Sequence, residues 1–220
     1  MKITSILFDN DGLLVDSERV TFEIWQEIFL RHGYDLSMED YCEVVGLNEA
    51  STAQHIMEKF PGLDPYEDVF REWDERYEIL APAGGVPLKK GAVELLDYAD
   101  SRGFRKAVAS SNSLYWVSVL LGANGIFDRM DAVSHGKLVT HGKPAPDIFL
   151  KAAELLGSEP SECLVLEDSP NGIRAAAAAG MVPICIPDLR QPPEEITELC
   201  AAVLSDLGAV IGWLEENTAD

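Results

Sequence analysis

Two aspartates stand at the end of the first apolar stretch of the chain, and this position suggests chemistry. Residues 6–8, Ile-Leu-Phe, form a short apolar run of the kind found in a buried strand, and Asp9 and Asp11 follow it closely. Two carboxylates at the end of such a strand repel each other and lose hydration unless a partner compensates them. The pair is therefore either a solvated turn or part of a site that holds a cation and does chemistry.

Other polar residues stand where further expected strands end or where a helix begins. They are Ser110, Ser111, Asn112, Lys143, Glu167 and Asp168. Because ligands of parallel α/β sheets bind beyond the carboxyl ends of the strands, we expect these residues to converge with Asp9 and Asp11 on one edge of the sheet.

The carboxylates of this expected site carry more negative charge than its one lysine balances. Asp9, Asp11, Glu167 and Asp168 supply four carboxylates, against the single ammonium of Lys143. Like charges about 4 Å apart cost on the order of 4 kcal/mol per pair at an effective dielectric constant near 20. A divalent cation would remove most of that repulsion, and a ligand set made only of oxygen suits Mg²⁺ rather than zinc. The sequence therefore predicts a Mg²⁺ site that works beside a substrate phosphate.

Strands and helices alternate along most of the chain. Strand patterns lie at residues 3–8, 106–111, 131–136, 163–169, 182–187 and 201–207, with helical patterns between them at 91–102, 114–124, 146–156 and 171–179. This alternation predicts an α/β fold with a doubly wound, parallel, Rossmann-like sheet.

One interval breaks the alternation with helical patterns alone. Apolar residues recur at helical spacing over 17–32, and shorter helical patterns follow at 37–45, 49–59 and 66–80. The segment Ala-Pro-Ala-Gly-Gly-Val-Pro at 81–87 then punctuates the chain. We therefore expect a core domain formed by residues 1–16 and 86–220, with residues 17–85 inserted as an α-helical cap.

Composition and charge restrict the class of partner. The 220 residues are 47% hydrophobic and 25% charged, as in ordinary globular proteins, and 17 Lys and Arg against 38 Asp and Glu give a net charge of −21. Such a chain repels nucleic acid and anionic membranes, so neither is an expected partner.

The N-terminal residues do not resemble a signal peptide, no apolar run is long enough to span a membrane, and the four cysteines are scattered. We expect a monomeric cytoplasmic protein with reduced thiols.

Four motifs, in their order along the chain, resemble the haloacid dehalogenase superfamily. They are Asp-x-Asp-Gly-x-x-x-Asp-Ser-Glu starting at Asp9, the strand-end serine Ser110, Lys-Pro-x-Pro starting at Lys143, and Glu-Asp-Ser-x-x-Gly starting at Glu167. Within the superfamily, the chain is similar to the group that carries a helical cap after the first motif. That group includes sugar phosphatases and β-phosphoglucomutase.

The resemblance implies a role for each matching residue. Asp9 would be the nucleophile that forms an aspartyl-phosphate, and Asp11 would act as general acid and then as general base. Ser110 would hydrogen-bond the phosphoryl group, and Lys143 would orient Asp9. The same resemblance implies that Mg²⁺ is held by Asp9, Asp168 and the main-chain carbonyl of Asp11, with Glu167 near or among the ligands.

The choice of reaction depends on residues that match or fail to match relatives in that superfamily. Dehalogenases lack the second acid, so Asp11 favours phosphoryl chemistry, and Lys59 is poorly placed to be the Schiff-base lysine of phosphonatases. Thr21, Glu49 and Ser113 stand where β-phosphoglucomutase has a histidine, an arginine and a lysine. We therefore expect a Mg²⁺-dependent phosphatase acting on a sugar or polyol monophosphate. A phosphosugar mutase is the alternative, followed by a binding protein without turnover.

Substrate would sit between the cap and the core, where hydroxyl-binding groups are expected. The candidate substrate-binding residues are Ser111, Asn112, Glu18, Asn48, Glu49 and Thr52.

Overall fold

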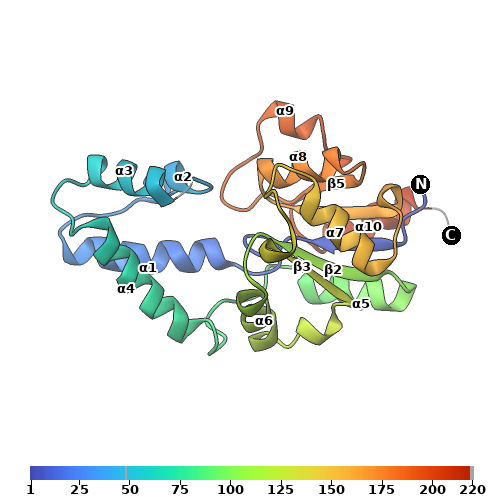
Figure 1. Ribbon diagram of the computed structural model, residues 1–220, viewed down its shortest axis with the longest axis horizontal. Coiled ribbons are helices and arrows are strands. Elements are labelled where there is room, and N and C mark those ends of the chain that lie inside the picture. Colours follow the sequence, from blue (N-terminus) through green and yellow to red (C-terminus); the bar gives the residue numbers. More distant parts are fainter. Residues whose placement is uncertain (48, 219–220) are drawn as a thin grey trace. The chain divides into compact units, whose positions relative to one another are not determined.

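The computed structural model describes residues 1–47 and 49–218. The chain divides into two compact units (Figure 1). One unit is formed by Met1–Asp16 together with Pro87–Asp220, and the other is Ser17–Val86. The motif residues from Asp9 to Asp11 and from Ser110 to Asp168 all belong to the first unit.

The first unit contains a sheet of six strands. These are β1 (Ser5–Phe8), β2 (Arg105–Ser110), β3 (Ala132–His135), β4 (Cys163–Glu167), β5 (Val182–Cys185) and β6 (Ala202–Val203). They lie in the order β3-β2-β1-β4-β5-β6, and every neighbouring pair is parallel. Because the strand order runs outward from β1 in both directions, the prediction of a doubly wound, Rossmann-like α/β fold is confirmed.

Helices cover both faces of this sheet. Helices α7 (Asp147–Leu156) and α8 (Pro170–Ala178) lie on one face, and α5 (Ala92–Arg102) and α6 (Leu114–Ala123) lie on the other (Figure 1). Leu7 and Val165 form one buried cluster with Phe149 of α7 and Ala176 of α8. Since successive strand residues point to opposite faces, the fully buried Phe8 packs on the other side.

The register of the strands brings three strand ends together. Phe8, the last residue of β1, is paired with Val108 of β2 and Leu166 of β4. The N–H of the next residue, Asp9, donates to the carbonyl of Leu166 at 3.0 Å. The residue after Leu166 is Glu167, so both acids leave the sheet at the same edge.

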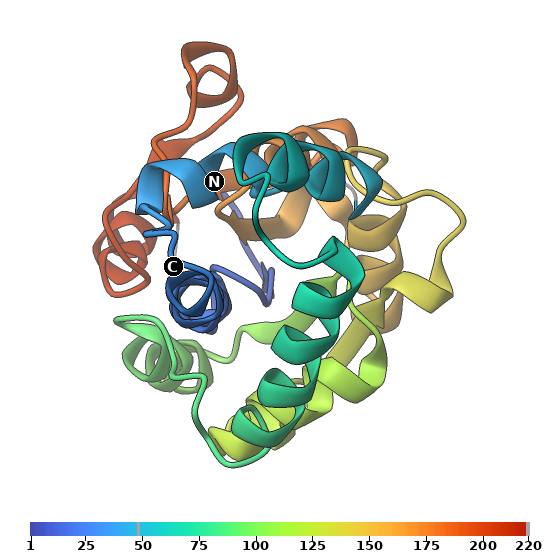
Figure 2. The ribbon, with the colours of Figure 1, turned by 90° about the vertical axis from the view of Figure 1, so that its left-hand side faces the viewer.

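The second unit is helical over its described residues, 17–47 and 49–86. Its helices are α1 (Ser17–Arg31), α2 (Met38–Val44), α3 (Glu49–Lys59) and α4 (Tyr66–Leu80). α1 contacts α4, and α3 contacts both α2 and α4 (Figure 2, where α1 is seen nearly end-on). Val20, Ile24 and Ile28 recur at helical spacing on α1 and are buried, and Trp25 stacks on Phe29 with ring centroids 6.1 Å apart.

The structure differs from the predicted elements mainly near the C-terminus. The strand expected at 201–207 is reduced to the two residues of β6, and helices α9 (Glu194–Thr197) and α10 (Ala209–Asn217) were not predicted. Three short 3₁₀ helices were not predicted either: Phe127–Arg129, Pro160–Glu162, and Gly136–Leu138, which overlaps the end of the strand expected at 131–136. β6 is an edge strand that pairs only with β5 in the described sheet. Its length is therefore set by this pairing and not by the length of its apolar sequence pattern. Within the described residues, no helix combines the length and the apolar character that a membrane span requires.

Candidate active site

Asp9 lies beside a buried ammonium group at the end of β1. Lys143 Nζ donates to Asp9 Oδ1 at 2.5 Å, to Glu167 Oε1 at 2.7 Å and to the carbonyl oxygen of Ala109 at 3.2 Å. Only 9% of the Lys143 side chain and 11% of the Asp9 side chain are exposed. One lysine from the loop before α7 therefore joins the ends of β1, β2 and β4.

Glu167 is fixed through both of its oxygens. Oε1 accepts from Lys143, and Oε2 accepts from the N–H and the hydroxyl of Ser169 at 2.7 and 2.9 Å. Ser169 is also the N-cap of α8, because its hydroxyl accepts from the N–H of Gly172 at 3.1 Å. A Cβ at Gly172 would stand 1.7 Å from Glu167 Oε1, so the last glycine of the motif makes room for this carboxylate.

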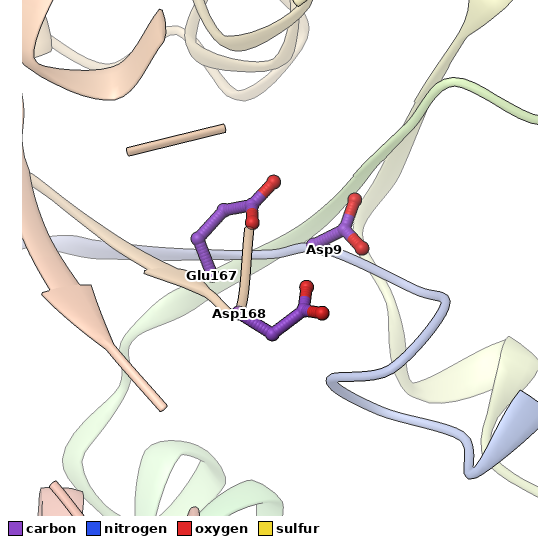
Figure 3. Close-up of side chains that lie close together, drawn as sticks. All are labelled: Asp9, Glu167 and Asp168. Carbon is purple, nitrogen blue, oxygen red and sulfur yellow. The ribbon is translucent and has the colours of Figure 1, made fainter. Parts of the chain in front are cut away.

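Asp9, Glu167 and Asp168 form a group of acids that could hold a metal ion. Each offers a carboxylate oxygen, and these oxygens lie within 4.8 Å of one another (Figure 3). Gly12 borders the group with a φ of +77°, and a Cβ there would stand 2.6 Å from Asp168 Oδ2. The left-handed backbone and the close carboxylate both require glycine at this position of the first motif.

Asp11 is held differently, by two amides. Its Oδ2 accepts from Asn112 Nδ2 at 2.8 Å and from Asn10 Nδ2 at 3.2 Å. The backbone N–H of Asn112 donates to the hydroxyl of Ser110 at 3.1 Å, so the loop after β2 contacts the first motif and orders the strand-end serine. Asn112, predicted to bind substrate, contacts the second acid in this structure.

Burial governs the protonation of these acids. Burial raises the pKa of Asp9 to about 7, against the lowering effect of Lys143 and with a further rise from Glu167 and Asp11. Burial, and then the charges of Glu167 and Asp9, raise the pKa of Asp168 well above its usual value. Burial alone would lower the pKa of Lys143, but the charges of Asp9 and Glu167 hold it above its usual value. One lysine is thus too little to keep all the acids ionised near neutral pH, and a bound cation would supply the missing charge.

The residues predicted from the sequence fall into three groups. Asp9, Lys143, Glu167 and Asp168 meet directly, and Ser110, Asn112 and Asp11 adjoin them through the contacts given above. The carboxylate of Asp11 is outside the three-acid group, and its main-chain carbonyl as a metal ligand stays a prediction. Ser111 is exposed. Glu18 and Thr52 belong to the helical unit, whereas Asn48 and the side chain of Glu49 lie outside what the structure describes.

The helical unit has a pocket of its own, of about 270 Å³, which Glu18 and Thr52 line. Five aromatic residues form much of its wall: Trp25, Tyr41, Tyr66, Phe70 and Trp73. The Tyr41 hydroxyl donates to Glu18 Oε2 at 2.8 Å, and burial together with Glu18 raises the pKa of Tyr41, so this donor keeps its proton. None of the described residues lining the pocket is Lys, Arg or His.

Two residues of the site were missed by the sequence analysis. Asn10, between the two aspartates, is fully buried and supports Asp11. Asp188, three residues after β5, lies next to Asp168. Its charge helps to raise the pKa of Asp168, although burial and the charges of Glu167 and Asp9 contribute more. An acid closely following an apolar strand was the signal that identified Asp9 and Asp168, and the same signal is present before Asp188.

Known proteins resemble this chain in sequence. A family model described as a haloacid dehalogenase-like hydrolase matches residues 3–180. A probable pseudouridine-5′-phosphatase from Drosophila melanogaster is 34% identical over 212 residues, which cover 94% of this chain and 90% of that protein. The chain is also 33% identical over 213 residues to Protein SUPPRESSOR OF QUENCHING 1, chloroplastic, from Arabidopsis thaliana, but it spans only 19% of that protein's length.

A solved structure has the same fold. CbbY from Rhodobacter sphaeroides in complex with phosphate is 30% identical, with a TM-score of 0.72 over 94% of this chain and 96% of that one. A mutant of the same protein, in complex with xylulose-(1,5)bisphosphate, is 29% identical with a TM-score of 0.71 over 94% and 95%. The resemblance inferred from the motifs is confirmed: the chain belongs to the family of haloacid dehalogenase-like hydrolases.

Proposed function

We propose that the protein is a Mg²⁺-dependent phosphatase that hydrolyses a small phosphate monoester through an aspartyl-phosphate on Asp9. The observation that carries this proposal is the pair of differently held aspartates: Asp9 against Lys143 within a group of acids, and Asp11 held by two amides. One carboxylate is poised where a cation and a phosphate would meet. The other is free of that acid group and suited to proton transfer.

The acids fit a magnesium ion. Asp9 and Asp168, with Glu167 beside them, offer only oxygen ligands, and the absence of a side chain at Gly12 lets the carboxylate of Asp168 approach the first motif closely. The raised pKa values of Asp9 and Asp168 reflect a charge imbalance that a divalent cation would correct. When bound, magnesium would neutralise charge on the phosphate and keep Asp9 ionised.

In the first half of the reaction, a carboxylate oxygen of Asp9 attacks phosphorus while Lys143 holds the side chain in place. The bond between phosphorus and the ester oxygen breaks, its electron pair stays on that oxygen, and Asp11 gives the oxygen a proton. Ser110, whose hydroxyl accepts from Asn112 N–H, can donate its own proton to a phosphoryl oxygen. Positioning and charge stabilisation are the main requirements of such a transfer.

In the second half, Asp11 acts as a base. It takes a proton from a water molecule, whose oxygen attacks the phosphorus of the aspartyl-phosphate. The bond from phosphorus to Asp9 breaks, the carboxylate of Asp9 is restored, and inorganic phosphate leaves. The same residue gives a proton in one half and takes one in the other, so each turnover returns the site to its starting state.

The helical unit supports a monophosphate as the substrate. We assign residues 17–85 as a cap, and the lining of the pocket within it suits the organic part of an ester. Aromatic walls with Glu18, Thr21 and Thr52 suit a ring or chain that carries hydroxyl groups. The pocket's described lining has no cationic side chain, which disfavours a second phosphate such as that of a bisphosphate intermediate. A sugar or polyol monophosphate is therefore favoured over the phosphosugar mutase reaction.

Phosphate release from a substrate panel tests the proposal. The panel would hold hexose, pentose and polyol phosphates, a nucleoside monophosphate and a generic aryl phosphate, each with Mg²⁺ and with a chelator. We expect Mg²⁺-dependent release that Asp9→Asn lowers by at least 10³-fold, with a covalent phosphoprotein detectable by mass spectrometry in the wild type only.

Three outcomes would contradict this proposal. Isomerisation of β-glucose 1-phosphate in the presence of the bisphosphate, with little hydrolysis, would indicate a mutase. Inactivity on every compound, with and without Mg²⁺, would favour a binding protein. Undiminished turnover by Asp9→Asn would exclude Asp9 as the nucleophile. The matched control is Asp35→Asn, which makes the same change at an exposed aspartate.

A further inference from the structure

A fifth carboxylate lies at the edge of the sheet where the candidate site is found. The N–H of Ile186, just after β5, donates to the carbonyl of Glu167 at 2.8 Å, so the chain stays hydrogen-bonded to the last residue of β4 beyond the end of β5. Two residues later comes Asp188, whose side chain is only 4% exposed. The chain thus places this acid beside Glu167 and Asp168.

The two oxygens of Asp188 have different surroundings. Oδ1 accepts from Lys89 Nζ, which also reaches Asp16 Oδ1 at 3.2 Å. Oδ2 is buried and has no hydrogen-bond partner among the described residues. An unpaired carboxylate oxygen away from solvent is costly. Such an oxygen indicates a partner that is not part of the protein.

The unpaired oxygen of Asp188 and a carboxylate oxygen of Asp168 both lie close to Gly12. The point where a Cβ of Gly12 would stand is 2.6 Å from Asp168 Oδ2 and 3.2 Å from Asp188 Oδ2. A side chain at position 12 would collide with the nearer of these oxygens. Two carboxylate oxygens, one from the end of β4 and one from beyond β5, therefore both pack close to Gly12 and lie near each other.

We propose that Asp188 is a positioning residue for the magnesium ion, with Oδ2 accepting a hydrogen bond from a water molecule bound to that ion on the side of Asp168. This inference rests on the proposed Mg²⁺-dependent function. Magnesium commonly keeps several of its waters in proteins, and carboxylates that bind such waters rather than the metal still orient the site. Loss of an outer partner of this kind typically lowers metal affinity 10- to 100-fold.

The competing explanation is that Asp188 only neutralises Lys89. Lys89 lies next to the segments that connect the two units: its N–H donates to the carbonyl of Leu14 at 2.9 Å, and the N–H of Asp16 donates to the carbonyl of Pro87 at 2.9 Å. If Asp188 served only this ion pair, its loss would affect stability and leave Mg²⁺ binding unchanged.

Direct Mg²⁺ binding to the full chain, measured by isothermal titration calorimetry without substrate, separates the two explanations. We expect Asp188→Asn to raise the Kd for Mg²⁺ by 10- to 100-fold. Asp206→Asn is the matched control, because Asp206 forms the same kind of ion pair, at 2.8 Å, with Lys90, the residue next to Lys89. This variant should keep the Kd for Mg²⁺ within twofold of the wild-type value. An unchanged Kd in Asp188→Asn would overturn the inference.

A second variant keeps the inference testable if Asp188→Asn fails to fold. Lys89→Met removes the ammonium and leaves the Asp188 carboxylate, so Mg²⁺ binding should be retained or become tighter. Weaker binding in Lys89→Met would mean that the ion pair, and not Asp188 itself, supports the metal site. Phosphatase turnover of the wild type is measured on the same preparation: its absence would refute the proposed function, whereas the ratio of Kd values decides the role of Asp188.

Discussion

At the scale of single residues, the acids of the site differ in the hydrogen-bond partners that hold their carboxylates. Glu167 has both oxygens bonded, to Lys143 and Ser169, so it organises the loop and the lysine. Asp9 shares the same lysine and stays next to the other acids. Asp11 alone is held by neutral amides. Residues of the same type are thus suited to different tasks because their hydrogen-bond partners differ.

The amide of Asn112 provides a test at this scale. Asn112→Ala removes the 2.8 Å hydrogen bond to Asp11 Oδ2 and leaves the proposed proton donor poorly oriented. A hydrogen bond to a charged group contributes about 1.5–3 kcal/mol, and Asp11 would be charged when it acts as the base of the second half of the reaction. We therefore expect kcat to fall roughly 10- to 100-fold with little change in KM. Steady-state kinetics on the best substrate of the panel measures both constants.

Asn124→Ala is the control for this change. Asn124 Nδ2 donates to the carbonyl of Leu120 at 2.8 Å, at the end of α6, so its loss costs stability without touching the acids. A rise in KM with kcat unchanged in Asn112→Ala would instead support the direct substrate contact that the sequence suggested for this residue.

At the scale of elements, the sequence predicted the sheet because its buried strands are apolar runs followed by polar residues. Asp9 follows β1, and β4 ends at Glu167. The carboxyl ends of parallel strands lie at one edge of a sheet, and this does not depend on the conformation of the loops between the strands. The helices that pack on the sheet carry clear 3.6-residue patterns, as α7 does with Ile148, Phe149 and Ala152. These features depend on local sequence, so they could be recognised without the structure.

Features that depend on contacts between distant segments could not be predicted in the same way. The strand-end argument placed Asn112 at the same edge of the sheet as Asp11, but it did not predict that their side chains, 101 positions apart, are hydrogen-bonded. It gave no indication of the contact between Asp188 and Lys89, which are 99 positions apart. β6 has only two paired residues, whereas the apolar pattern predicted a strand over residues 201–207. Tertiary contact, and not intrinsic preference, decides such cases.

A pair of N-cap serines tests how an element supports the site. Ser169 caps α8 and Ser37 caps α2; each hydroxyl accepts a backbone N–H at 3.1 Å and donates to a nearby carboxylate. Replacing either with Ala should cost about 1 kcal/mol of unfolding free energy through the lost cap. Only Ser169→Ala also removes the 2.9 Å hydrogen bond from a hydroxyl to Glu167, so only this variant should lower kcat/KM, by about tenfold.

Urea unfolding and steady-state kinetics on both variants give the two quantities. Equal losses of kcat/KM in the two variants would mean that the effect follows general stability and not the position of Glu167. Retention of full activity by Ser169→Ala would show that the Ser169 N–H, at 2.7 Å, suffices to hold this carboxylate.

At the scale of the whole molecule, a net charge of −21 makes any further buried negative charge unfavourable. The carboxylates of the site are therefore expected to take up protons or a cation as conditions change. Burial, opposed by Lys143, raises the pKa of Asp9 from 3.8 to about 7 in the folded protein. Protonation of this one residue links the stability of the fold to both pH and magnesium.

Without a divalent cation, the raised pKa means that the folded state binds a proton more tightly than the unfolded state. The stability that Asp9 contributes is then fully present below pH 3.8 and is lost as the pH rises through about 7, with a slope of at most about 1.4 kcal/mol per pH unit. The unfolding free energy of the wild type, minus that of Asp9→Asn, should therefore fall between pH 5 and pH 7 in a chelating buffer. Because Mg²⁺ would bind the ionised carboxylates, its stabilising effect should be larger at pH 7.5 than at pH 5, and Asp9→Asn should reduce it. Urea titrations across this pH range, with and without Mg²⁺, measure both differences. A difference between the two proteins that does not change with pH would show that Asp9 is already ionised throughout, so that Lys143 alone offsets its burial.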